Sequence, residues 1–481
     1  MKDDNRLINL LLDIPEENQT IEFKRLAGDR IVRKIIETVV AFANTDGGSI
    51  ILGIDDPEKT TLKGFDRIYG IEENKETFDE IMRELQRIVP PISHIRPSSL
   101  IEVKQIQKTV ALLHVPKATV AFHSIDNNVF VRLNKGNKKL TPSEIVKMSY
   151  AKGFNKADHE LVDVDFDLLN TKHYKTWLSQ RRVTGDNIEE ILFKTGLARK
   201  DSDIVKPTRA AVLLFAEYPT NIMDTKCTVR IMRIKGRLEH YGEVPNMIGT
   251  PKTVEGPMLE LIQKTHESVL DILRTGIEMH SGFITKYQLP ERSVKEAITN
   301  AIIHRDYHIK RDIEVKIFED RVEVMSPGLF AYNITAQNIG HVRSDGYRND
   351  LLVKHMREFP DPPNLDQNEG VKAMRNEMAS NGLFPPVYIT YPMLEDSVNV
   401  VLLNEHRSDE WEKVKGYLLA NRYIANVKAR EITGVEQRDK MSRLLNKWVR
   451  QGLLLRIQPK DGGVKGTKYK LSNAQELPDD K

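Results

Sequence analysis

The sequence predicts an α+β protein with several domains. Its 481 residues exceed what one hydrophobic core supports, and a usual size of about 150 residues per domain suggests roughly three domains. Segments whose apolar residues recur at helical spacing alternate with segments in which apolar and polar residues alternate one by one, as in strands. With 40% hydrophobic and 29% charged residues, the composition is that of a globular protein.

Composition excludes several classes of protein. No run of eighteen apolar residues occurs, so we expect no membrane-spanning helix and no membrane partner. The start of the chain is charged throughout and lacks a small-residue cleavage site, so we expect no signal peptide. The single cysteine, Cys227, excludes internal disulfides and cysteine-cluster zinc sites, and we expect a cytoplasmic protein.

Residues 1–150 are predicted to form a compact first domain. A short strand at 20–24 precedes a helix whose apolar face is Ile31, Ile35, Ile36, Val39 and Val40. A glycine-containing turn at 44–48 leads into an apolar strand at 50–54. We expect the remaining elements to be strands at 100–106, 110–115 and 129–133 and helices at 76–88 and 142–150.

The runs IEFK, AFANTDGGSIILGIDD and NNVFVRLNKGNKKL closely resemble the Alba-like domain of the Schlafen superfamily. The resemblance covers almost all of residues 1–150 and implies a nucleic-acid-binding domain. Some members of that superfamily are metal-dependent ribonucleases that use two glutamates and an aspartate. Carried over, these would be Glu17, Glu22 and either Asp55 or Asp56, holding Mg²⁺ or Mn²⁺, with Lys24 neutralising the transition state. Plain nucleic-acid or partner binding is the alternative.

Basic residues support nucleic-acid binding by this domain in either case. They gather near its first helix and near its last predicted strand, beside glycine loops that could approach phosphates closely. The candidates are Arg25, Arg30, Arg132, Lys135, Lys138 and Lys139.

Residues 151–405 are predicted to hold a connector and a central domain. Its key stretch begins as a helix with Val294, Ile298, Ala301 and Ile302 at helical spacing, and continues as a strand pair at 313–317 and 322–324. Glu296 and Asn300 stand four apart, so they share one helix face. Around this stretch we expect strands at 210–215, 229–234, 387–390 and 398–403 and a helix at 257–275.

This stretch, with its HRDY run at 304–307 and its Ser-Pro-Gly turn at 326–328, resembles a divergent GHKL-type ATPase domain, an α/β sandwich. The resemblance implies ATP and Mg²⁺, with Asn300 as metal ligand and Glu296 as general base. The implied nucleotide-binding residues are Glu296, Asn300, Asp306, Gly328 and Gly370. The chain departs from the family at two points, because Ser326 stands in the turn that normally holds an adenine-binding Asp, and the phosphate lid has one glycine. These departures argue against ATP hydrolysis, so we expect ATP binding without turnover. A degenerate fold that serves dimerisation is the alternative.

Residues 406–481 are predicted to form a winged helix-turn-helix. Helices are expected at 410–420, 427–432 and 437–450, followed by strands at 453–457 and 467–471, and this order is that of a winged helix. Between residues 411 and 475 there are 15 Lys and Arg residues against 5 Asp and Glu residues, although the whole chain has a net charge of only +3. We expect DNA contacts from Gln437, Arg438, Lys440, Arg443, Lys447 and Lys465.

Together these features predict an ATP-binding transcriptional regulator that binds DNA through its C-terminal domain and forms a homodimer or higher homo-oligomer. One alternative is a Schlafen-like metal-dependent endonuclease that acts on RNA or DNA in defence against foreign nucleic acid. A second alternative is a non-catalytic dimeric scaffold.

Overall fold

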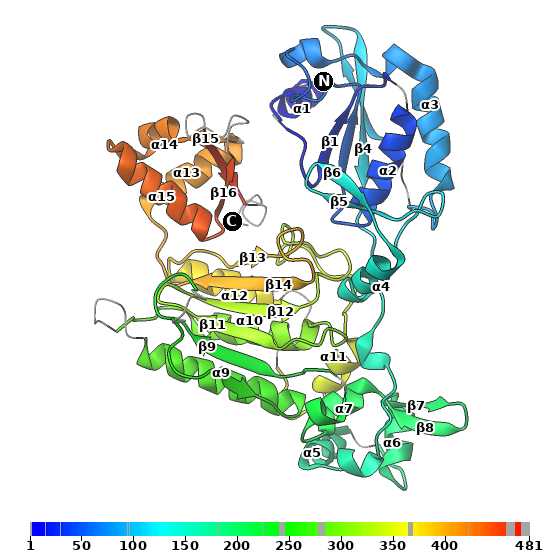
Figure 1. Cartoon of the computed structure of the whole chain (residues 1–481), viewed down its shortest axis with the longest axis vertical. Coiled ribbons are helices and arrows are strands. Elements are labelled where there is room, and N and C mark those ends of the chain that lie inside the picture. The colour runs from blue at the N-terminus through cyan, green and yellow to red at the C-terminus, as the bar shows by residue number, and fades with distance from the viewer. Residues whose placement is uncertain are drawn as a thin grey trace. The chain divides into compact units, whose positions relative to one another are not determined.

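The computed structural model divides into two compact units, Met1–Ser149 and Tyr150–Lys481, which are described separately (Figure 1). The residues that the structure describes are 2–14, 16–28, 30–93, 95, 97–181, 183–223, 225–239, 246–277, 284–363, 369–421, 423–457 and 467–472. Lys465 lies outside these residues. Among them, no helix combines the length and the apolar character needed to cross a bilayer.

The first unit is built on a four-stranded sheet with the order β1-β2-β4-β3. Its strands are β1 (Ile21–Lys24), β2 (Gly48–Leu52), β3 (Pro97–Val103) and β4 (Lys108–Val115), and only β1 and β2 pair in parallel. Ile50 and Leu52 share a core with α2 (Ile31–Ala43) and α3 (Lys75–Glu84), whereas Ile51 shares a core with α1 (Lys2–Leu12). The alternation of a strand thus places helices on both faces.

Two elements complete the first unit. The hairpin β5 (Phe130–Leu133) and β6 (Gly136–Lys139) packs along α2, and α4 (Pro142–Ala151) leads into the second unit. Asn44 ties the end of α2 to this hairpin, because its amide donates hydrogen bonds to the carbonyls of His123 (2.8 Å) and Phe130 (2.9 Å).

The second unit contains a six-stranded sheet with the order β10-β9-β11-β12-β14-β13. The helices α9 (Met258–Thr275), α10 (Glu291–His304) and α12 (Glu369–Ser380) pack beside one another, and the core between them and the sheet includes Val315, Val324 and Ile298 (Figure 1). The sheet has one parallel pair, β9 with β11, and is otherwise antiparallel. Its strands are β9 (Val229–Arg233), β10 (Lys252–Val254), β11 (Ile313–Ile317), β12 (Arg321–Pro327), β13 (Val387–Ile389) and β14 (Ser397–Leu403).

The predicted strand at 210–215 is wrong, because these residues belong to helix α7 (Arg209–Phe215). Thr208 caps this helix, since its hydroxyl accepts a hydrogen bond from the Ala211 amide at 3.3 Å. A short apolar run buried on all sides looks the same in a strand and in a helix, so periodicity could not decide. The other elements here are α5 (Lys172–Arg181), α6 (Ile188–Thr195), α8 (Pro219–Ile222), α11 (Asp350–Met356) and the hairpin β7 (Ala198–Asp201) and β8 (Ile204–Pro207).

The end of the described chain forms three helices and a small sheet of order β15-β17-β16. Trp411 and Trp448 meet edge to face at 5.2 Å in its core, which also takes in Phe384 and Leu403 from the six-stranded sheet and its flank. The elements are α13 (Asp409–Ala420), β15 (Ile424–Ala425), α14 (Asn426–Thr433), α15 (Arg438–Arg450), β16 (Leu454–Ile457) and β17 (Lys468–Leu471). The predicted α+β class with several domains is confirmed.

Candidate functional sites

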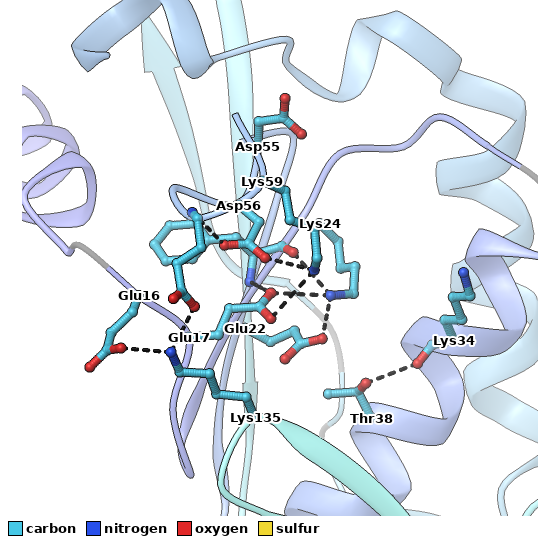
Figure 2. Close-up of polar contacts among 12 residues, drawn as sticks. Glu16, Glu17, Glu22, Lys24, Lys34, Thr38, Asp55, Asp56, Lys59 and Lys135 are labelled. Atoms are coloured by element: carbon cyan, nitrogen blue, oxygen red, sulfur yellow. Dashed lines mark hydrogen bonds and ion pairs between the residues drawn. The ribbon is translucent and has the colours of Figure 1, made fainter. Parts of the chain in front are cut away.

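Three buried carboxylates come together at one end of the first sheet (Figure 2). Glu22 lies in β1, Glu17 lies in the loop before β1, and Asp56 follows β2, which pairs in parallel with β1. Their exposed fractions are only 5%, 5% and 6%. Because burying charged oxygens is costly, such a set needs cations or protons close by.

Lysine and arginine side chains supply these cations. The Lys24 ammonium lies 3.2 Å from Glu17 Oε1 and also pairs with Glu22. The Arg132 Nη2 atom lies 2.5 Å from Glu22 Oε2, and the Lys59 ammonium lies 2.6 Å from Asp56 Oδ2. The cluster therefore balances its three negative charges with three positive ones.

The environment shifts the pKa values of two of these carboxyls in opposite directions. Burial raises the pKa of Glu17, and the attraction of Lys24 only partly offsets this rise. Burial also acts to raise the pKa of Asp56, but the hydrogen bonds from Lys59 and from the Glu58 amide outweigh burial, so this pKa is lowered. The pKa values of two neighbouring carboxyls are thus shifted apart, an arrangement that acid–base chemistry can use.

Asp55 takes no part in the cluster. Figure 2 shows its side chain pointing away from Glu17, Glu22 and Asp56. Its backbone carbonyl accepts hydrogen bonds from Arg67 Nε and Nη2, at 3.2 and 2.8 Å. Of the two aspartates that the sequence left open, Asp56 is the one beside the glutamates.

The three carboxylates have the oxygen chemistry that Mg²⁺ and Mn²⁺ prefer. Their arrangement does not yet fit an ion, because the Lys24 ammonium stands between Glu17 and Glu22. In the described part of the chain, these oxygens do not form a group of three ligand atoms within 4.8 Å of one another. A metal ion would therefore have to replace the lysine ammonium.

The basic candidates of the first unit differ in their surroundings. Arg132 is buried, with 1% of its surface exposed, and it forms an ion pair with Glu22. Arg25 is bound to Glu73, Lys135 to Glu16 and Glu58, and Lys138 to Glu144. Arg30 and Lys139 are exposed. Spacing along the chain could not reveal that Arg132 is buried beside a glutamate 110 residues away.

A second candidate site is a cavity of about 170 Å³ in the second unit. Glu296 and Asn300 on α10 line it, together with Gly328 after β12 and Gly370 on α12. The Asn300 amide donates a hydrogen bond to Glu296 Oε1 at 2.8 Å. Burial raises the pKa of Glu296, and this hydrogen bond acts against the rise. Carboxylate and amide oxygens at one place suit Mg²⁺.

The start of α12 presses on Glu296. A Cβ atom added at Gly370 would lie 1.7 Å from Glu296 Oε1, so a larger residue there requires Glu296 or α12 to move. Ser326, which stands where the family has its adenine-binding aspartate, lines the same cavity and donates to the Ala301 carbonyl at 2.8 Å.

Asp306, predicted to bind nucleotide, does not line the cavity. It is buried, and its Oδ1 atom lies 2.9 Å from both the backbone nitrogen and Nδ1 of His308. His308 Nε2 in turn lies 2.6 Å from Glu160 Oε1. The residue therefore orders the turn after α10 instead.

Sequence reasoning missed several residues around the cavity. Arg348 lines it, and its guanidinium donates to the carbonyls of Tyr150, Ala151 and Leu329. The His304 ring stacks on Tyr347 with centroids 6.0 Å apart, and the buried Tyr388 hydroxyl has no hydrogen-bond partner among the described residues. The available signal was the Arg-Asn-Asp run at 348–350, which places charged and amide side chains next to the apolar residues Leu351 and Leu352.

The third candidate site is the surface of α15. Gln437, Arg438, Lys440 and Arg443 are exposed at and after its N-terminus. Lys447 is half-buried, and its ammonium lies 2.5 Å from Glu405 Oε1. Lys447 therefore fastens α15 to the segment after β14, whereas Gln437, Arg438, Lys440 and Arg443 face solvent.

Comparison with known families gives two matches. Residues 17–141 match the family described as Schlafen, AlbA_2. Residues 310–402 match the family described as putative ATP-dependent DNA helicase recG C-terminal. The second match begins after α10, so Glu296 and Asn300 lie outside it.

The search of curated proteins found no match. Among solved structures, the chain is similar to the DIP2311 protein from Corynebacterium diphtheriae, with 17% identity, 94% of this chain and 95% of that chain covered, and a TM-score of 0.38. At this identity and score, the likeness carries no conclusion about fold or function.

Proposed function

Because the chain combines a Schlafen AlbA_2 domain with an ATPase-like domain of the RecG C-terminal type, we propose that it is a DNA-binding regulator that responds to a nucleotide. Both domain types are connected with nucleic acids or with ATP. The observation that carries the DNA proposal is the exposed polar surface formed by Gln437, Arg438, Lys440 and Arg443 on α15.

The elements around α15 support a winged helix-turn-helix. Three helices precede the antiparallel pair β16 and β17, and α14 and α15 are joined by a tight turn at Gly434, whose φ of 80° favours glycine. In such domains the third helix enters the major groove with its N-terminal residues on base edges. Arg438 and Lys440 occupy that part of α15.

The cavity beside α10 supports the nucleotide part of the proposal. Glu296 and Asn300 offer oxygen ligands for Mg²⁺, and the remaining wall is largely apolar, as a base requires. We propose that ATP binds there with Mg²⁺ and alters the affinity for DNA. Since regulators with winged helices commonly read paired half-sites, we further propose a homodimer.

A fluorescence anisotropy titration with random duplex DNA at several salt concentrations tests the DNA proposal. Arg443→Ala should weaken binding and lower the salt slope by about one, because one phosphate or base contact is lost. Lys413→Ala removes an equal charge from the exposed side of α13 and is the matched control. Absence of DNA binding by the parent protein, or equal losses in both variants, would refute the proposal.

A metal-dependent nuclease is a second candidate function, favoured by the meeting of Glu17, Glu22 and Asp56. Labelled transfer RNA, single-stranded DNA and duplex DNA are incubated with the protein and Mn²⁺, beside Glu22→Gln. Cleavage by the parent and not by the variant would establish the nuclease. Intact substrates with both proteins would leave the cluster a structural or binding element.

A further inference from the structure

A separate group of metal-ligating side chains lies away from the three sites above. Asp158 and His159 lie in a short 3₁₀ turn, Ala157–His159, and Asp350 is the first residue of α11. One ligand atom from each of the three residues lies within 4.8 Å of the other two. Asp158 is fully buried, with 0% of its surface exposed.

Only half of the Asp158 carboxylate is satisfied. Its Oδ2 atom accepts hydrogen bonds from the amides of Leu351 (2.8 Å) and Leu352 (3.3 Å) at the start of α11. Its Oδ1 atom is buried without a hydrogen-bond partner and lies 3.9 Å from His159 Nε2. Leaving a buried carboxylate oxygen without a partner is costly, and a cation bound at this atom would remove that cost.

The neighbours hold the other atoms of the group in place. Asp350 Oδ2 lies 2.7 Å from the Lys156 ammonium, and Asp350 Oδ1 lies 2.6 Å from His159 Nε2. Oδ1 of each aspartate and Nε2 of the histidine thus lie within 4.8 Å of one another. We propose that Asp158 Oδ1, His159 Nε2 and Asp350 Oδ1 bind a divalent transition-metal ion of the Zn²⁺ type, for which carboxylate and imidazole are usual ligands.

Metal binding at His159 competes with the contact between His159 and Arg199. Arg199 Nη2 lies 2.8 Å from His159 Nδ1, and a guanidinium can only donate, so Nδ1 accepts and the ring proton sits on Nε2, shared with Asp350. When Zn²⁺ takes Nε2, that proton moves to Nδ1, and the ring stays neutral. The exposed Arg199 side chain must then turn away from Nδ1. The hydrogen bond from Arg199 to His159 therefore lowers the affinity of the site for Zn²⁺.

The ion would fasten the 3₁₀ turn to the start of α11, one residue after Asn349. The Asn349 amide donates to the carbonyls of Ile303 (2.7 Å) and Arg305 (2.9 Å) at the end of α10. The binding site itself does not depend on the function proposed above.

Calorimetric titration of the full chain with ZnCl₂, in buffer with excess Mg²⁺, tests the site. Asp158→Asn keeps an oxygen for the two amides of α11 and replaces Oδ1 by an amide nitrogen, so the fold is retained and Zn²⁺ affinity should fall at least tenfold. Asp163→Asn changes an exposed carboxylate nearby and should leave affinity unchanged.

Arg199→Ala gives the sharper test, because it should raise Zn²⁺ affinity several-fold where a merely structural arginine would not. Circular dichroism checks that each variant is folded, and His159→Gln provides a second ligand variant if Asp158→Asn is unstable. No Zn²⁺ binding by the parent, or equal affinity in the parent and both ligand variants, would overturn the proposal.

Discussion

The side-chain amide of Asn300 donates a hydrogen bond to Glu296 Oε1 across 2.8 Å, one helical turn apart on α10. Both residues line the same cavity. Asn300→Ala should therefore abolish most of the heat of ATP·Mg²⁺ binding in a calorimetric titration, because a metal ligand is lost. Asn376→Ala on α12, outside the residues that line the cavity, serves as control. Equal heats from the parent and Asn300→Ala would remove Asn300 from the site.

Two glycines in helices should respond in opposite ways to alanine. At Gly370 the new Cβ would lie 1.7 Å from Glu296 Oε1, so either Glu296 must leave its hydrogen bond with Asn300 or α12 must shift, and we expect a loss of about 1–3 kcal/mol in the free energy of unfolding. At Gly416 in α13 nothing lies within 4 Å, so alanine should stabilise the helix by about 0.5–1 kcal/mol. Urea unfolding of the two variants measures both. A stable Gly370→Ala protein would mean that α12 does not press on Glu296.

Removing the lysine from the carboxylate cluster should make stability depend on pH. Burial already raises the pKa of Glu17, and Lys24→Gln removes the main opposing charge. An acid whose pKa is higher in the folded state loses stability as pH rises through its unfolded value near 4.5. Relative to the parent, Lys24→Gln should thus melt at a lower temperature at pH 7, and the difference in melting temperature should be smaller at pH 4.5.

The same variant tests whether an ion can replace the ammonium. Mn²⁺ should raise the melting temperature of Lys24→Gln more than that of the parent, because the oxygens of Glu17 and Glu22 are released from the lysine. Exposed Lys63→Gln is the control. An equal response of all three proteins to Mn²⁺ would show that the cluster has no metal affinity.

His355 should weaken the fold in mild acid. Burial lowers its pKa to about 4, although Glu358 Oε2, 3.0 Å from Nδ1, acts to raise it, and the Arg181 guanidinium, 2.9 Å from Nδ1, acts in the same direction as burial, so the folded ring is neutral. The unfolded chain binds the proton near pH 6.5, so stability falls as pH drops from about 6.5 to about 4, by up to roughly 3 kcal/mol.

Urea unfolding between pH 4 and pH 7 measures this effect. His355→Gln should flatten the curve, whereas His406→Gln, at an exposed position, should leave it unchanged. Parallel curves for the parent and His355→Gln would contradict the assignment.

Local patterns predicted the parts of the fold that local forces decide. The helical spacing of Val294, Ile298 and Ile302 gave α10, and single alternation gave β11 and β12. The apolar run at 210–215 carried no period and was assigned to the wrong element. Because all six of these residues are buried, no polar positions mark a solvent-facing side from which the type of element could be read.

Contacts between distant residues were beyond the sequence. The family resemblance brought Glu17 and Glu22 together, but only the bend after β2 decides that Asp56, and not Asp55, joins them. Arg132 is buried against Glu22, which lies more than a hundred residues earlier in the chain. The role of Arg348 at the cavity likewise depends on tertiary packing. Such partners leave no periodic trace in the chain.

The packing of Trp411 and Trp448 against Phe384, Val401 and Leu403 has a mechanical consequence. In the described part of the chain, one continuous set of apolar side chains is shared by the basic helix α15 and the sheet beside the cavity. A chain cut just before α13 would leave those sheet residues open to water, so neither piece would keep its full stability. The two regions should therefore melt in a single transition. A displacement of β14 by a bound molecule would be transmitted to α15 directly through these packed side chains.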